Sequence, residues 1–110
     1  MKLQSPGLRV RIYVGDHDQW HGKSLYASIV QEARKHGLAG ATVARGIMGY
    51  GAHNAIHEPH LFRLAGGLPV VIELVDSEEA IQAFLPILDD MVGEGMITVS
   101  AVEVITYSKG

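Results

Sequence analysis

Three short segments of this sequence combine residue types that could bind a charged ligand. In Gly49-Tyr50-Gly51, the glycines would let backbone amides approach a phosphate while Tyr50 stacks on the ligand or shapes the pocket. A glycine-rich turn with a packed tyrosine would have the same sequence. Both interpretations therefore stay open for this segment.

The segment Trp20-His21-Gly22-Lys23 stands directly before a predicted helix. The N-terminus of a helix offers free backbone amides to anions, and Lys23 and His21 would add positive charge. In the alternative interpretation, Trp20 packs as a hydrophobic plug and Gly22 caps the helix.

Histidines make up the third group. His53, His57 and His60 would share one face of a local helix, and histidine is the commonest metal-ligating residue. Pro59 argues against a regular helix at this point. A second loose cluster contains Asp16, His17, Asp18 and His21. We interpret both groups as solvated polar loops and predict no metal site.

Catalytic residue patterns are weak in this chain. Serine, histidine and aspartate are present, but none of the serines stands in a nucleophile-elbow sequence. The adjacent carboxylates Asp89 and Asp90 fit the solvent face of a helix. We therefore predict a binding protein with no catalytic residues and no required cofactor.

The composition is that of one globular domain over residues 1–110. The absence of cysteine excludes disulfides and thiolate metal sites, and it suits a reducing compartment. A formal net charge of -3 argues against a nucleic-acid partner. No apolar stretch is long enough to span a bilayer, and the N-terminal residues MKLQSPGLRV contain no apolar run suited to a signal peptide. The expected location is the cytoplasm.

The elements that must position these residues follow from periodicity. Alternating apolar and polar residues predict a strand over 8–14. An apolar stripe predicts a helix over 23–36, which Gly37 would end in the left-handed conformation. The intervening segment 15–22 is predicted to be a loop, and 41–50 a second strand.

The second half of the chain begins with an irregular stretch over 51–67, followed by a third strand over 68–75. Asp76 is predicted to cap a second helix with Glu79 as its capping-box partner. Pro86 lies inside this helix and predicts a kink. The helix is expected to end before the glycines at 93 and 95.

A last strand is predicted over 97–107. Its apolar residues are odd-numbered at Ile97 and Val99 but even-numbered at Val102 and Val104. This change of phase predicts a bulge near residues 100–101.

The resulting order β-α-β-β-α-β predicts an α+β, ferredoxin-like fold, with two helices on one face of a four-stranded antiparallel sheet. If the even-numbered residues of the first and third strands face the helices, the other face mixes apolar and oppositely charged groups. These are Arg9, Arg11, Tyr13, Val71, Glu73 and Val75. We predict that Glu73 pairs with an arginine of the first strand and that this face forms a subunit interface. The alternative is a solvated sheet face with a surface ion pair.

Five sequence motifs are spread along nearly the whole chain: Arg11-Ile12-Tyr13-Val14-Gly15, Trp20-His21-Gly22-Lys23, Gly37-Leu38-Ala39-Gly40-Ala41-Thr42-Val43, Arg45-Gly46-Ile47 and Leu68-Pro69-Val70-Val71-Ile72-Glu73. Together they resemble a family of uncharacterised PII-like proteins. In addition, Thr42-Val43 leads to Gly49-Tyr50-Gly51. This order resembles, more distantly, the nitrogen-regulatory PII proteins, in which a Thr-Val strand leads to a Gly-Phe-Gly turn that opens the long T-loop.

The resemblance implies a PII-like signalling protein, a homotrimer with adenine-nucleotide sites in the clefts between subunits. Thr42 would help to hold the adenine. The T-loop base at Gly49, Tyr50 and Gly51 and the glycine loop at Gly93 and Gly95 would line the phosphates.

Two departures from the PII pattern alter the implied phosphate site. The phosphate-binding lysine of PII proteins is replaced by Met96, and two arginines of the last PII strand have no counterpart near Thr106 and Tyr107. Since phosphates require charge-assisted donors, AMP or ADP is expected to bind better than ATP. Substitute charge would come from Arg45, Lys23 and His21.

The implied function is a sensor in which the nucleotide repositions the 51–67 loop. A partner protein, such as a membrane transporter or channel, would read the state of that loop. The alternatives are a metal-binding trimer that uses the loop histidines, and a small nucleotide-hydrolysing enzyme.

Overall fold

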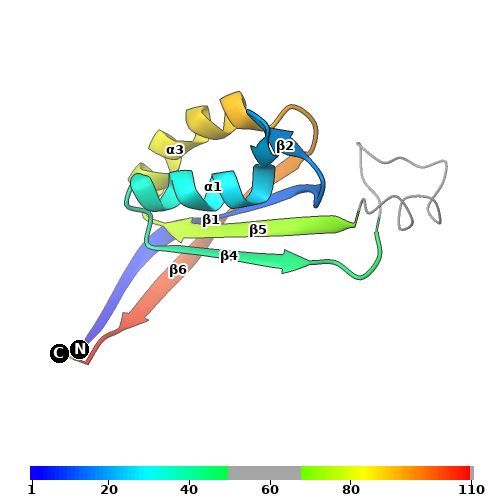
Figure 1. The fold of residues 1–110 in the computed structure, drawn as a ribbon. Helices are drawn as coiled ribbons and strands as arrows, with labels where there is room; N and C mark the ends of the chain where they lie inside the picture. Colours follow the sequence, from blue (N-terminus) through cyan, green and yellow to red (C-terminus); the bar gives the residue numbers. More distant parts are fainter. Residues whose placement is uncertain (50–67, 110) are drawn as a thin grey trace.

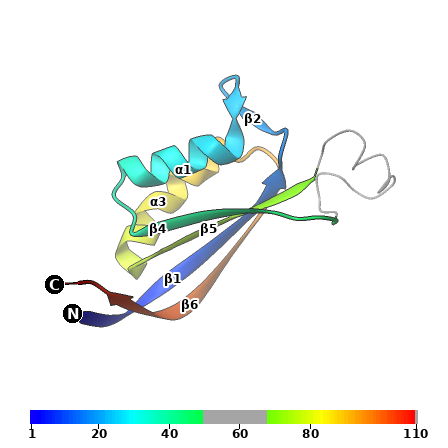
Figure 2. The ribbon, with the colours of Figure 1, turned by 60° about the horizontal axis from the view of Figure 1, so that its bottom comes forward.

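The computed structural model describes residues 1–49 and 68–109 of the chain. Its elements are β1 (Lys2–Gly15), β2 (Gln19–Trp20), β3 (Lys23–Ser24), α1 (Leu25–Lys35), β4 (Gly40–Arg45), β5 (Pro69–Asp76), α3 (Glu78–Met91) and β6 (Met96–Tyr107). The main sheet has the strand order β4-β5-β1-β6, and all of its neighbours are antiparallel. Both long helices cover one face of this sheet, which confirms the predicted α+β, ferredoxin-like arrangement (Figures 1 and 2).

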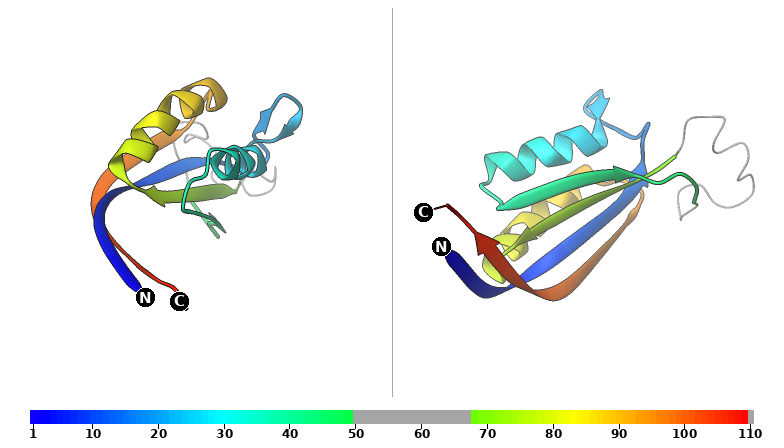
Figure 3. Two further views of the ribbon diagram at one scale, coloured as in Figure 1. Left: turned by 90° about the vertical axis from the view of Figure 1, so that its left-hand side faces the viewer. Right: turned by 90° about the horizontal axis from the view of Figure 1, so that it is seen from below.

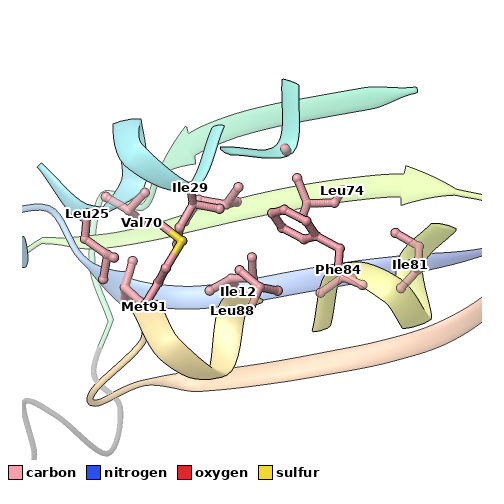
Figure 4. Packing of buried hydrophobic residues seen from close by; sticks show 13 residues of the cluster. Ile12, Leu25, Ile29, Val70, Leu74, Ile81, Phe84, Leu88 and Met91 are labelled. Atoms are coloured by element: carbon pink, nitrogen blue, oxygen red, sulfur yellow. The ribbon is translucent and has the colours of Figure 1, made fainter. Parts of the chain in front are cut away.

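The hydrophobic core lies between the helices and the two central strands. Even-numbered residues of β1 and β5 point into it, as the alternation predicts, and each helix contributes its apolar stripe (Figure 4). The largest fully buried side chains among the described residues are Val10, Ile12, Ile29, Val70, Ile72, Leu74, Ile81, Phe84 and Leu88. On the opposite sheet face, here called the open face, no helix of the described residues lies over the sheet.

The segment predicted to be a loop before α1 contains a small hairpin. Gln19 pairs with Ser24 and Trp20 with Lys23, so α1 begins at Leu25 and not at Lys23. The two turn residues, His21 and Gly22, have φ values of 52° and 76°. Positive φ at both central positions is what a two-residue hairpin with a type I′ turn requires. Gly22 therefore belongs to this turn and does not cap α1.

The strand that begins at Gly40 ends at Arg45, so the prediction that it reaches Tyr50 is wrong. After Arg45, the amide of Gly46 donates to the carbonyl oxygen of Pro69 at 2.7 Å. A Cβ atom at Gly46 would lie only 2.8 Å from Cγ of Pro69. Glycine therefore fits at this position, where a larger residue would clash. Tyr50 itself lies outside the described residues.

The cap of α3 is Ser77 and not Asp76. The Ser77 side chain accepts from the amide of Ala80 at 3.1 Å. Asp76 instead accepts from the amide of Ala39 at 2.9 Å and so ties the end of β5 to the residues before β4. Pro86 lies within α3, and the helix ends at Met91 before the two glycines, as predicted.

Replacement of Ser77 by alanine is expected to lower the free energy of unfolding by about 1 kcal/mol, because the amide of Ala80 loses its acceptor. Urea denaturation followed by circular dichroism would measure the change. Ser108→Ala, at an exposed position near the C-terminus, is the matched control and should alter stability by less than about 0.5 kcal/mol. Equal stabilities of the two variants would contradict the assignment of the cap.

The predicted bulge in the last strand is absent. β1 and β6 pair in one unbroken register, from Lys2 opposite Tyr107 to Tyr13 opposite Met96. The apolar residues of β6 change from odd-numbered to even-numbered positions because the helices cover only part of the β1–β6 strand pair. Val99 pairs with Val10 on the helix face, whereas Val102 and Val104 belong to the open face.

The β1–β6 ribbon extends beyond the rest of the sheet. β1 begins at Lys2 rather than at the predicted Leu8, while β5 pairs with it only from Leu8 onward. We call the projecting part, residues 2–7 and 102–107, the arm; it curves towards the side opposite the helices (Figure 3). Gly7 stands at the junction, where a Cβ atom would meet the carbonyl oxygen of Asp76 at 2.5 Å. Only glycine allows β5 to end so close to β1 at this point.

Among the described residues, no helix is long and apolar enough to cross a membrane.

Candidate functional site

The open face carries the predicted ion pair. Nε of Arg11 lies 3.0 Å from Oε1 of Glu73, and the two residues are directly opposite each other on β1 and β5. The hydrogen bond to Glu73 raises the pKa of Arg11. A shallow depression on the same face is lined by Arg11, Tyr13, Thr42, Ala44, Val71 and Glu73.

Thr42 lies on the edge strand of this depression. Its Cα is paired with that of Glu73, and its side chain is exposed. Because side chains alternate along a strand, Arg45 is directed to the helix face of the sheet while Thr42 belongs to the open face. The structure therefore does not bring these two predicted nucleotide-binding residues onto the same face of one subunit.

Arg45 has a carboxylate neighbour that the sequence did not identify. Its Nε lies 3.5 Å from Oδ2 of Asp16, and the amide of Asp16 donates to the carbonyl oxygen of Leu68 at 3.0 Å. The Asp16 side chain is only 10% exposed, whereas that of Arg45 is 55% exposed. Oδ1 of Asp16 is buried and has no hydrogen-bond partner among the described residues, although Nε2 of His17 lies 3.9 Å from it. Asp16 thus holds one edge of a guanidinium whose remainder is accessible to a ligand.

The glycine loop before β6 packs against the end of β1. A Cβ atom at Gly95 would lie 2.7 Å from the carbonyl oxygen of Tyr13, and Gly95 has a φ of 150°. Gly93 lines a small surface hollow together with Asp18, Gln19, Leu25 and Glu94. The glycine loop and the hairpin segment therefore adjoin each other, as the sequence did not predict.

His21 and Lys23 lie on the β2–β3 hairpin, and both are exposed. The His21 ring stacks on Trp20, with ring centroids 4.0 Å apart and an interplanar angle of 17°. Trp20 in turn packs against the core, which confirms its interpretation as a hydrophobic plug.

The loops at one end of the sheet collect most of the predicted site residues. The hairpin, the glycine loop and the segment that follows Arg45 all lie at this end (Figures 1 and 2). Gly49 is also placed here, since a Cβ on it would lie 3.2 Å from Cγ of Pro69. Tyr50 and Gly51 are outside the described residues. Thr42 stands apart, on the open face.

The metal interpretation finds no support in the described part of the chain, where no group of three or more ligating side chains comes together. The loose cluster from Asp16 to His21 is therefore not assembled into a site. His53, His57 and His60 lie outside the described residues. Asp89 and Asp90 are exposed on α3, as predicted.

Comparison with known proteins gives a family and a fold. The protein-family model DUF190, described as Uncharacterized ACR, matches residues 7–104. A UPF0166 protein of Aquifex aeolicus is 41% identical over 98 residues, which are 87% of this chain and 90% of that protein.

Solved PII-like structures have the same fold. CPII, a nitrogen regulatory PII-like protein from Thiomonas intermedia K12, was solved bound to ADP, AMP and bicarbonate. It superposes with a TM-score of 0.59 at 19% identity over 93% of this chain and 91% of CPII. The GlnK–ATP complex of B. subtilis has a TM-score of 0.57 at 16% identity over 88% of this chain and 82% of GlnK.

Proposed function

Since this chain belongs to the DUF190 family and has the fold of PII-like proteins, we propose that it is a PII-like regulator, a homotrimer that binds an adenine nucleotide in clefts between its subunits. The nucleotides in CPII and GlnK support this ligand class. In this proposal the chain acts as a binding protein and not as an enzyme.

The observation that carries the proposal is the exposure of the candidate ligand groups. Thr42 lies on an edge strand of the uncovered open face, and the Arg45 guanidinium is half exposed at the loop end. The described residues of the subunit enclose neither group, and ligand pockets normally bury most of a small ligand. A second subunit placed against the open face would supply the missing wall beside Thr42, whereas Arg45, which is directed to the helix face, would need a neighbouring subunit at the end of the sheet.

The charges near the sheet end favour a nucleotide with few phosphates. Arg45 offers a planar fork of N–H donors suited to a phosphate, while the glycine loop is followed by Met96 instead of a cation. Lys23 and His21 would add charge from the hairpin. AMP or ADP therefore suits this end of the sheet better than ATP does.

The output of the sensor is proposed to be the segment 51–67, which follows the site directly in the chain. A nucleotide that binds one state of this segment more tightly shifts the population towards that state. A partner protein such as a membrane transporter or channel would then bind one state in preference to the other.

Calorimetry with AMP, ADP, ATP and cyclic AMP tests the proposal. We expect AMP and ADP to bind with one site per chain, and ATP to bind more weakly. Analytical ultracentrifugation of the same sample should give three times the chain mass. Chromatography of the nucleotide after incubation should recover it unchanged, whereas conversion to products would favour an enzyme. A folded protein that gives no heat with any of the four nucleotides would refute the proposed ligand class.

A further inference from the structure

The carboxylate of Asp16 lies almost buried at the loop end of the sheet. Its side chain is only 10% exposed, and Oδ1 has no hydrogen-bond partner among the described residues. Burial of a charged group without full hydrogen bonding costs stability. A neutral residue would avoid that cost, so the carboxylate is better explained by a role in ligand binding than by the fold.

The backbone around Asp16 holds this carboxylate in place. The residue directly follows β1, and its amide donates at 3.0 Å to the carbonyl oxygen of Leu68, directly before β5. The preceding residue, Gly15, is paired with Pro69. Because an aspartate side chain is short, its carboxylate cannot move far once the backbone is fixed. Oδ2 therefore stays beside Nε of Arg45, 3.5 Å away.

Asp16 alters what Arg45 can offer to a phosphate. The Arg45 side chain is 55% exposed, so N–H groups of its planar fork remain available to a ligand. A phosphate there would gain hydrogen bonds, but it would meet a guanidinium whose charge a fixed carboxylate already balances. Since the Coulomb energy falls only with the inverse of distance, the same carboxylate also acts on phosphate groups that do not contact Arg45.

The groups around this pair add further negative charge. Asp18 and Glu94 line the hollow between the hairpin segment and the glycine loop. In the described segments 15–24, 44–49 and 93–96, the carboxylates are Asp16, Asp18 and Glu94, and the permanent cations are Lys23 and Arg45. Histidines in these segments add charge only when they are protonated. Each phosphate beyond the first would therefore enter a region with an excess of carboxylates.

We propose that Asp16 determines how many phosphates the bound nucleotide can carry. Its carboxylate balances the charge of Arg45 and repels the further phosphates of a diphosphate or triphosphate. The inference rests on the proposed function, which supplies the adenine nucleotide. It assigns the selection against ATP to a charged residue that is present, in addition to the cation that Met96 replaces.

Two substitutions of Asp16 test this role. Asp16→Asn removes the charge but keeps an oxygen that can accept from Nε of Arg45, whereas Asp16→Ala removes both. Calorimetry with adenosine, AMP, ADP and ATP is done at pH about 8, where phosphate monoesters are fully ionised. Magnesium is left out, because it would neutralise part of the phosphate charge. In both variants, the ratio of ATP affinity to AMP affinity is expected to rise about 10-fold, while adenosine affinity stays within about twofold.

Glu79→Gln is the matched control, since Glu79 is exposed in the first turn of α3, at the end of that helix remote from the glycine loop. It removes the same charge and should leave the ATP-to-AMP ratio within about twofold of the natural protein. An unchanged ratio in both Asp16 variants, at the natural oligomeric state, refutes this inference and leaves the proposed ligand class standing. Equal weakening of AMP, ADP and ATP in Asp16→Ala alone would make Asp16 a positioning residue for Arg45 and overturn the proposal. Absence of binding by all four ligands to the natural protein and both variants refutes the proposed function as well.

The natural protein provides a further test without any substitution. Added sodium chloride screens the repulsion between Asp16 and the outer phosphates. The ratio of ATP affinity to AMP affinity should therefore rise with ionic strength. A ratio that falls with added salt would show net attraction for the additional phosphates and would contradict the proposal.

Discussion

Replacement of Phe84 by alanine is expected to lower the free energy of unfolding by about 3–5 kcal/mol. Phe84 is 2% exposed and is the largest of the fully buried side chains. It projects from α3 into the core between the helices and the sheet (Figure 4). The ring of His36 also contacts it edge-on, with centroids 5.6 Å apart. The loss of stability therefore has two parts: the transfer free energy of the removed aromatic side chain, and the cost of a cavity that the rigid neighbours cannot fill.

Urea denaturation of both proteins at one protomer concentration measures this effect, because association contributes to the apparent stability of an oligomer. Gln82→Ala is the control on the exposed side of the same helix and should change stability by less than about 0.5 kcal/mol. A loss below about 1 kcal/mol in Phe84→Ala would show that the core is not packed around this ring.

Replacement of Arg45 by glutamine is expected to weaken ADP binding by about 10- to 100-fold, which is the worth of a hydrogen bond to a charged group. The half-exposed guanidinium lies at the loop end, with its Nε edge towards Asp16. Glutamine keeps part of the length and polarity but cannot carry the charge. Adenosine lacks the phosphates, so its affinity should be the same for both proteins.

Arg34→Gln is the matched control, since Arg34 is exposed in the last turn of α1. It removes the same charge away from the proposed site and should leave ADP affinity within about twofold of the natural protein. Sedimentation of Arg45→Gln must show the natural oligomeric state, so that lost binding is not a result of lost assembly. If the ratio of ADP affinity to adenosine affinity were unchanged in Arg45→Gln, Arg45 would not be a phosphate-binding residue.

Most of the candidate site was only partly predictable, for reasons that differ between residues. The prediction placed Thr42 and Arg45 in one site, yet three residues of separation in a strand put them on opposite faces. Asp16 was noted only as part of a loose polar cluster. Its contact with Arg45 depends on β1 and β4 ending at the same end of the sheet, which no local pattern reveals.

The errors in the fold have a common cause. Asp76 and Ser77 are both good helix caps, and the choice between them depended on the amide of Ala39, far away in the sequence. The apolar residues of β6 change from odd-numbered to even-numbered positions, as they would at a bulge. In the structure, this change marks the point beyond which the helices no longer cover the sheet. In both cases the deciding contact joins residues that are distant along the chain.

The sequence by itself determined the order of the elements and the face that each one buries. Alternation in β1 and β5, and the apolar stripes of α1 and α3, depend only on spacing along the chain, so they can be read without knowing any partner. The open face, with an arginine of β1 paired to Glu73, followed from the same spacing. Only the tertiary structure decided that Arg11 is that arginine, that Asp16 contacts Arg45, and that β4 and β6 are the outer strands of the described sheet. These features depend on strand order and register, which are set by packing between segments remote in sequence.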